Sequence, residues 1–180
     1  MDNLAKDVQI GADRLLYMPY LMGERTPHLD ANARGAFVGL SAIHEKKHLI
    51  RAVMEGVGYS LKDCLGILEE MGVASDDMRL CGGGAKSKLW REIITDTFGV
   101  SGSVTENDEG PAFGAAILAM VGTGIYKDTE SACDCIVKAK ETISVNSENH
   151  NRYMKYYEVY KGLYQSLKND FAKLAEVCEK

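Results

Sequence analysis

Three consecutive glycines followed by small and basic residues form the part of this sequence best suited to ligand chemistry. The apolar residues 78–81 lead into the glycines at 82–84, and apolar side chains then recur at helical spacing over residues 89–98. α/β proteins use a strand, a glycine turn and a helix in this order to hold phosphorylated ligands. Glycines let backbone N–H groups approach the ligand, and a helix N-terminus carries partial positive charge. On these residues alone, a structural turn and a nucleotide-binding loop remain equally open.

The glycine stretch differs from two better-known phosphate-binding motifs. It is not a Walker A loop, because Lys86 follows Ala85 rather than glycine and the four-residue spacer is missing. It is not a GxGxxG dinucleotide motif either, because position 87 is a serine. The motif therefore predicts close backbone approach to a ligand without naming the ligand.

A second candidate for chemistry is the sequence His44-Glu45-Lys46-Lys47-His48, which matches the HExxH pattern of zinc proteases. In those enzymes two histidines on one helical face bind zinc and the glutamate activates water. A later acid such as Glu69 or Glu70 is the available third ligand. Two lysines inside the motif would sit beside the cation. We interpret the motif as the exposed start of a helix, with zinc as the alternative.

Composition narrows the possible functions. The 180 residues carry a net charge of −5 and are 46% hydrophobic, which fits one globular domain without a basic surface for nucleic acid or an anionic membrane. No apolar run approaches the roughly 20 residues of a membrane-spanning helix, and the polar start lacks a signal-peptide core. The five cysteines contain no CxxC pair and predict reduced thiols. We therefore expect a cytoplasmic protein with no nucleic-acid or membrane partner.

Strand and helix patterns alternate along the chain and predict a parallel or mixed sheet covered by helices. Ser41 is the predicted N-cap of a long helix that ends at Gly72. A helix lined by small residues begins at residues 109–111. The remaining predicted elements are strands within 15–21, 35–40 and 100–105, and a short helix or loop over 128–140.

The last predicted helix, residues 148–177, carries a seam of apolar and aromatic residues at alternating steps of four and three. Its members are Tyr153, Tyr157, Tyr160, Tyr164, Leu167, Phe171, Leu174 and Cys178. We interpret it as a terminal helix laid across the same domain. A dimerising coiled coil, and with it a homodimer, is the alternative, although Gly162 interrupts the helix.

Taken together, three stretches resemble the C-terminal domain of the FGGY carbohydrate kinases, and within that family the xylulokinases. The first runs from Tyr20-Leu21-Met22-Gly23-Glu24-Arg25-Thr26-Pro27-His28 through residues 33–40 to residues 48–55. The second is Gly82-Gly83-Gly84-Ala85-Lys86-Ser87 with Trp90, and the third is residues 109–116. The resemblance covers nearly the whole chain in order.

The resemblance implies a ribonuclease-H-like, actin-like ATPase α/β fold that is incomplete at its N-terminal side. Residues 1–146 would form the truncated nucleotide-binding domain and residues 147–180 a C-terminal helix packed on it. The implied reaction transfers the γ-phosphate of Mg²⁺-ATP to the ketose D-xylulose, chiefly through positioning and charge stabilisation. Gluconokinase specificity and a non-catalytic nucleotide-binding or interaction module are the alternatives.

The resemblance also implies which residues contact the nucleotide. Gly83, Gly84 and Ala85 would approach the adenosine, and Ser87 and Lys88 would reach its adenine or ribose. The catalytic aspartate and most sugar contacts would lie in an upstream part absent from this sequence. No catalytic residue and no metal ligand is therefore assigned here, and the chain alone is expected to be inactive.

Overall fold

The computed structural model describes residues 2–73, 78–106 and 110–178. Two compact units divide the chain. The first unit comprises residues 1–74, 96–99 and 146–180, and the second comprises residues 75–95 and 100–145. The chain returns to the first unit at residue 146. No helix in the described part of the chain is long and apolar enough to cross a membrane.

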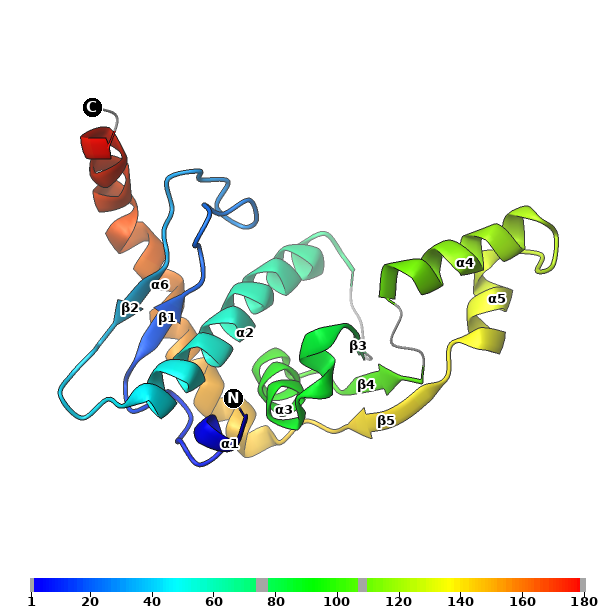
Figure 1. The fold of residues 1–180 in the computed structure, drawn as a ribbon, viewed down its shortest axis with the longest axis horizontal. Helices are drawn as coiled ribbons and strands as arrows, with labels where there is room; N and C mark the ends of the chain where they lie inside the picture. The colour runs from blue at the N-terminus through cyan, green and yellow to red at the C-terminus, as the bar shows by residue number, and fades with distance from the viewer. Residues whose placement is uncertain (1, 74–77, 107–109, 179–180) are drawn as a thin grey trace. The chain divides into compact units, whose positions relative to one another are not determined.

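The first unit is built from two long helices, a short helix and a two-stranded antiparallel ribbon (Figure 1). These elements are α1 (Asp2–Ala5), β1 (Leu16–Met18), β2 (Ala36–Val38), α2 (Lys46–Glu70) and α6 (Ser147–Cys178). Strand β1 pairs with β2, and all three of its residues are buried, as its nearly continuous apolar sequence predicts. The core cluster of the first unit is formed by Val8, Ala12, Leu15, Tyr17 and Ala52.

Helix α2 meets β1 so closely that only glycine fits at the contact. A Cβ atom added at Gly56 would lie 2.0 Å from the backbone oxygen of Tyr17. By contrast, a Cβ atom at Gly66, three turns further along the same helix, would meet nothing within 4 Å. The two glycines therefore have different roles, and only Gly56 sets the spacing between helix and strand.

The start of α2 differs from the prediction, whereas its end agrees with it. The helix begins at Lys46 with Glu45 as its N-cap, so the predicted N-cap at Ser41 is wrong. The backbone N–H of Ser41 instead donates to Nδ1 of His44 at 2.9 Å, which forms a turn before the helix. At the other end, Gly72 follows the C-cap with φ +83°, a conformation that suits glycine.

A buried ion pair joins α2 to α6 and to the N-terminal loop. Arg51 Nε donates to Glu55 Oε1 at 2.6 Å, and the two side chains are only 6% and 1% exposed. The other carboxylate oxygen of Glu55 accepts the N–H of Gly11 at 2.9 Å. Arg51 Nη2 also donates to the hydroxyl of Tyr153 at 2.7 Å. Three segments distant in sequence thus share one polar cluster inside the unit.

The tyrosines of α6 fasten this helix to the first 63 residues. The hydroxyls of Tyr20 and Tyr160 lie 3.1 Å apart, and Tyr157 donates to Asp63 at 2.6 Å. Tyr164 donates to Asp30 at 2.9 Å. The ring of Tyr164 also stacks on that of His28, with ring centroids 3.7 Å apart. The predicted seam therefore packs, over much of its length, within the first unit.

The second unit contains a three-stranded mixed sheet with helices, which agrees with the predicted mixed sheet. Its elements are β3 (Met78–Leu80), the 3₁₀ helix η1 (Gly83–Lys86), α3 (Lys88–Phe98), β4 (Gly102–Thr105), α4 (Gly110–Gly122), α5 (Thr129–Ile136) and β5 (Ala139–Ile143). The last three residues of α3 belong to the first unit. The strand order is β3-β4-β5, with β3 parallel and β5 antiparallel to β4.

The second unit differs from the prediction at β5 and agrees with it at the start of α4. Residues 128–140 contain the expected short helix, but the strand β5 that follows was missed, because four of its five residues are exposed and show no apolar alternation. Helix α4 has Pro111 in its first turn, as predicted. Glu109, named as part of that helix start, lies outside the described residues.

Candidate functional site

The glycine stretch forms a tight turn that is followed directly by α3. Gly82 has φ +78° and precedes η1, in which the Ala85 N–H donates to the Gly82 carbonyl. Ser87 then starts α3, because its hydroxyl accepts the backbone N–H of Trp90 at 3.0 Å. The predicted order of strand, glycine turn and helix is therefore present, with Ser87 occupied as a helix cap.

Gly83 and Gly84 leave the backbone of this turn exposed. Both are exposed, and a Cβ atom at Gly83 would meet nothing within 4 Å. At Gly84 a Cβ atom would lie 3.1 Å from Nε1 of Trp90, whose side chain is half-buried. The space beside Gly83 is therefore open to a ligand, whereas the space beside Gly84 borders the indole.

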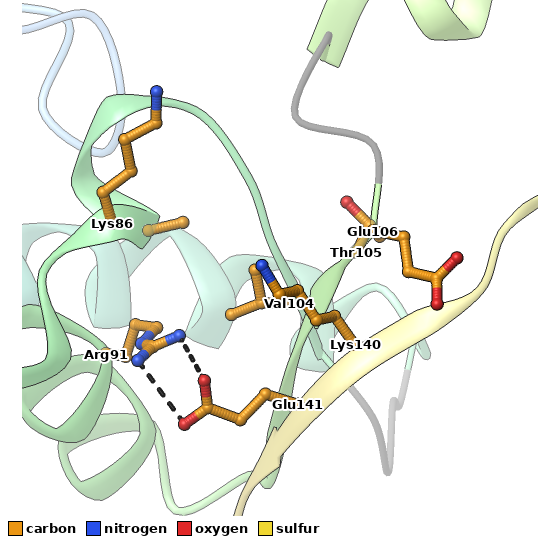
Figure 2. A pocket seen from close by; sticks show the side chains of 8 residues that line it. Lys86, Arg91, Val104, Thr105, Glu106, Lys140 and Glu141 are labelled. Carbon is orange, nitrogen blue, oxygen red and sulfur yellow. Dashed lines mark hydrogen bonds and ion pairs between the residues drawn. The ribbon is translucent and has the colours of Figure 1, made fainter.

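A pocket of about 300 Å³ lies beside this turn (Figure 2). It is bounded by Ala85 and Lys86 after β3, by Arg91 on α3, and by the ends of β4 and β5. Its remaining lining residues are Val104, Thr105, Glu106, Lys140 and Glu141. The carboxyl ends of parallel strands are where open α/β sheets bind ligands, and the loops after β3 and β4 both reach this pocket.

One ion pair forms part of the pocket wall. Arg91 extends from α3 to Glu141 on β5, with N–O distances of 2.9 and 3.5 Å (Figure 2). The Arg91 side chain is 12% exposed, and its Nε is buried without a hydrogen-bond partner among the described residues. The Arg91–Glu141 pair therefore supplies charge to this wall of the pocket.

The pocket contains only part of the predicted set of site residues. Ala85 lines it, whereas Gly83 and Gly84 stand beside it in the same turn. Ser87 is the cap of α3, and the exposed Lys88 lies 3.7 Å from Glu92 on its own helix. Neither of these last two residues lines the pocket.

Sequence reasoning missed the charged residues that line this pocket. Arg91 could have been found, because it lies one helical turn after Ser87, to whose carbonyl its N–H donates at 3.1 Å. Lys140 and Glu141 could not have been found, because the strand that carries them was not predicted. Their positions depend on the antiparallel pairing of β5 with β4.

The histidines of the HExxH motif are engaged with the N-terminal loop. Nδ1 of His48 accepts the N–H of Glu45 at 2.9 Å, and its Nε2 lies 3.0 Å from a carboxylate oxygen of Asp13. The His44 Nε2 lies 3.1 Å from the backbone oxygen of Asp13. Over residues 2–73, 78–106 and 110–178, no group of three possible His, Cys, Asp or Glu ligands is present. The motif thus fastens the start of α2.

The loop between β1 and β2 is also held by its own hydrogen bonds. Glu24 accepts the backbone N–H of Thr26 at 2.9 Å, and Asp30 accepts that of Asn32 at 2.8 Å. This second bond, with the Tyr164 hydroxyl, lowers the pKa of Asp30 below its usual value. Burial lowers the pKa of His28, which therefore stacks on Tyr164 as a neutral ring near pH 7.

Comparison with known proteins places these features in a family. The sequence model described as "FGGY family of carbohydrate kinases, C-terminal domain" matches residues 1–123, which include the glycine turn, α3, β4 and α4. The chain belongs to the FGGY family of carbohydrate kinases. Its α/β fold is accordingly the actin-like ATPase fold of FGGY kinases, with a long C-terminal helix.

Curated FGGY relatives agree on the chemistry more than on the sugar. A xylulose kinase of Staphylococcus epidermidis is 43% identical over 97% of this chain, and that of Bacillus subtilis is 36% identical over 90%. A gluconokinase of Bacillus subtilis is 32% identical over 98% of the chain. These matches cover 35%, 32% and 34% of the relatives, so the chain spans about a third of their length.

Solved FGGY structures give the same picture. A ligand-bound xylulose kinase from Lactobacillus acidophilus matches 96% of this chain and 35% of its own, with a TM-score of 0.87 at 28% identity. A gluconate kinase from the same organism gives the same values. A Plasmodium falciparum glycerol kinase with ADP, at 21% identity and a TM-score of 0.75, shows the shared fold alone. Backbone similarity therefore does not separate xylulose from gluconate kinases.

Proposed function

We propose that this chain is the ATP-binding C-terminal part of a sugar kinase that transfers the γ-phosphate of ATP to D-xylulose. The observation that carries the proposal is the 43% identity to a xylulose kinase over 97% of the chain. Gluconate is the second candidate acceptor, since a gluconokinase matches 98% of the chain at 32% identity.

The adenosine end of ATP would lie against the glycine turn. Gly83 and Gly84 allow the backbone to approach the nucleoside, and Ala85 presents only a methyl group to the adjoining pocket. Ser87 and Lys88 would contribute from the start of α3, because a helix N-terminus provides backbone N–H groups that favour negatively charged or acceptor groups of a ligand. Arg91, which lines the pocket and pairs with Glu141, is a charged residue that sequence reasoning did not select.

The phosphates and the metal would be held mainly elsewhere. Mg²⁺ in kinases is bound largely through substrate phosphates and one or two carboxylates. The described residues provide no cluster of three metal ligands, so no metal position is assigned to this chain. Phosphoryl transfer also needs a group that accepts the sugar hydroxyl proton, which we place outside this sequence. The chain alone should therefore be inactive.

We expect no ADP formation above background when the 180-residue chain is mixed with Mg²⁺-ATP and D-xylulose. The full-length enzyme that contains the chain should form ADP with D-xylulose and turn over gluconate poorly. A coupled assay with both sugars measures this directly. Turnover by the chain alone would contradict the division of the site, and a preference for gluconate would favour the second candidate.

Gly83→Val should raise the KM for ATP of the full-length enzyme by about tenfold or more and leave the KM for the sugar almost unchanged. The valine meets no protein atom at its Cβ, so its effect reports on the nucleotide. Gly84→Val is a poorer test, because its Cβ lies against Trp90.

Gly162→Val is the matched control for Gly83→Val. Its Cβ also meets nothing within 4 Å, and it lies on α6 in the first unit. This variant should leave both KM values unchanged. An unchanged KM for ATP in Gly83→Val would contradict the proposed adenosine position. It would not contradict the proposal that the full-length protein is a sugar kinase.

A further inference from the structure

Asp96 lies in the last turn of α3, a position that does not favour a carboxylate. The C-terminus of a helix carries partial negative charge, and aspartate is among the weaker helix formers. Asp96 is nevertheless only 5% exposed, within a run of five buried residues at 93–97. A buried carboxylate requires hydrogen-bond donors, so the reason for its presence lies in its partners.

Both carboxylate oxygens of Asp96 bind the start of α6. Oδ1 accepts the backbone N–H of Asn146 at 2.8 Å, and Oδ2 accepts the side-chain amide of Asn149 at 2.9 Å. The backbone oxygen of Asp96 accepts Nδ1–H of His150 at 2.8 Å. The N-terminus of α6 thus favours the negative charge that the end of α3 does not. We call Asp96, Asn146, Asn149 and His150 the Asp96 cluster.

Two further contacts hold the end of α3 in the first unit. Gly99 has φ +73°, and a Cβ atom there would lie 2.7 Å from Cε1 of His150. From α2, Nζ of Lys62 donates to the backbone oxygen of Phe98 at 3.2 Å. Helices α2 and α6 therefore both contact the residues that end α3.

The other end of α3 carries the proposed nucleotide site. Ser87 caps the first turn directly after the glycine turn, and Arg91 lines the pocket beside it. Residues 88–95 of α3 belong to the second unit, whereas residues 96–98 belong to the first. One continuous helix of eleven residues, about 16 Å long, thus connects the Asp96 cluster to the glycine turn.

We propose that Asp96 is a positioning residue for the adenosine end of ATP. Its cluster fixes the end of α3, and through this helix it holds the glycine turn in the position that binds the nucleoside. Misplacing a binding group by about 1 Å can cost about a hundredfold in rate, so a small movement of α3 is sufficient. This inference rests on the proposed function, because it requires ATP to bind beside the glycine turn.

Asp96→Asn in the full-length enzyme tests the proposal. The new side chain keeps an oxygen for the Asn146 N–H, but its NH₂ group faces the amide donor of Asn149. We expect the KM for ATP to rise at least about fivefold and the KM for the sugar to stay unchanged, at a temperature well below Tm. A lower Tm with an unchanged KM for ATP would show that the cluster only stabilises the fold, and would overturn the proposal.

Exchanging the two side chains should restore ATP binding. In Asp96→Asn/Asn149→Asp the amide donates to the new carboxylate, which lies in the first turn of α6, where the helix dipole favours it. The KM for ATP should return to within about twofold of the natural value. Asn149→Asp alone brings two carboxylates together and should raise the KM. A double variant no better than Asp96→Asn would also overturn the proposal.

Tyr157→Phe is the control for a loss of stability alone. It removes the 2.6 Å hydrogen bond to Asp63, which joins α6 to α2 in the same unit. It should lower Tm and leave the KM for ATP unchanged. A rise equal to that of Asp96→Asn would assign the effect to stability and contradict the positioning role.

Asn149→Ala provides the comparison if Asp96→Asn does not fold. It removes one hydrogen bond of the cluster and leaves the bond to Asn146 intact, so the KM for ATP should rise by about twofold. A natural full-length enzyme that forms no ADP with either sugar would overturn the proposed function and this inference with it. An active natural enzyme whose cluster variants keep its KM for ATP would overturn this inference alone.

Discussion

We expect Arg51→Met to lower the free energy of unfolding of this chain by about 3–5 kcal/mol at pH 8, because it breaks a buried ion pair. The variant leaves the Glu55 carboxylate in place at 1% exposure, with the Gly11 N–H as its hydrogen-bond donor. It also removes the donor to the Tyr153 hydroxyl. Urea unfolding followed by far-ultraviolet circular dichroism measures the loss.

The loss should be smaller at pH 5 than at pH 8. Burial raises the pKa of Glu55 to about 7, although Arg51 and the Gly11 N–H act in the opposite direction. Because the folded-state pKa lies above the unfolded value, the stability contributed by this protonation is present below about pH 4.5 and is lost as pH rises through 7. Without Arg51 the pKa of Glu55 rises further, so the variant continues to lose stability above pH 7.

Arg51→Met/Glu55→Gln is the control for this mechanism. The glutamine keeps an acceptor for the Gly11 N–H but cannot titrate, so the double variant should recover much of the stability at pH 8. Its stability should also depend less on pH. A single variant that loses the same amount at pH 5 and pH 8 would show that the charge of Glu55 is not the cause.

The second large effect is expected at the contact between α2 and β1. Gly56→Ala should lower the free energy of unfolding by more than about 2 kcal/mol, because its methyl group would overlap the backbone oxygen of Tyr17. The neighbour is strand backbone, so relief requires α2 and β1 to separate. Such a shift disturbs a strand whose residues are all buried.

Gly66→Ala separates this steric effect from helix propensity. Both glycines lie inside α2, and alanine favours a helix by up to about 1 kcal/mol over glycine. The space beside Gly66 is open, so its alanine variant should be slightly more stable than the natural chain. Thermal unfolding of the two variants gives the comparison. Similar Tm values would mean that α2 does not pack on β1 through Gly56.

Elements that depend on local interactions could be predicted from the sequence, whereas an element that depends on distant residues could not. Helices α2, α3 and α6 were predicted because their apolar spacing is a local property of the chain. Strand β5 was not, because its exposed residues are ordered by pairing with β4 across some forty residues. The start of α2 was misplaced because the His44 and His48 side chains, rather than Ser41, accept the preceding backbone N–H groups.

The candidate site shows the same limit. The glycine turn and the start of α3 could be predicted, since both depend on residues 82–91. The role of Ser87 could not be fixed, because a hydroxyl at a helix start can cap the helix or contact a ligand. The Arg91–Glu141 pair became visible only when strand pairing placed residues fifty positions apart in contact.

The contacts of the α6 tyrosines show that the folded unit extends beyond the residues that the family model matches. The family match stops at residue 123, yet Tyr59 in α2 is fully buried beside Tyr160, with ring centroids 5.3 Å apart. Tyr20 also shares a hydroxyl contact with Tyr160. A protein recombined at residue 123 would inherit the family sequence but expose these aromatic side chains to water. The first unit is formed by residues 1–74, 96–99 and 146–180, so an exchange that keeps its contacts must include all three segments.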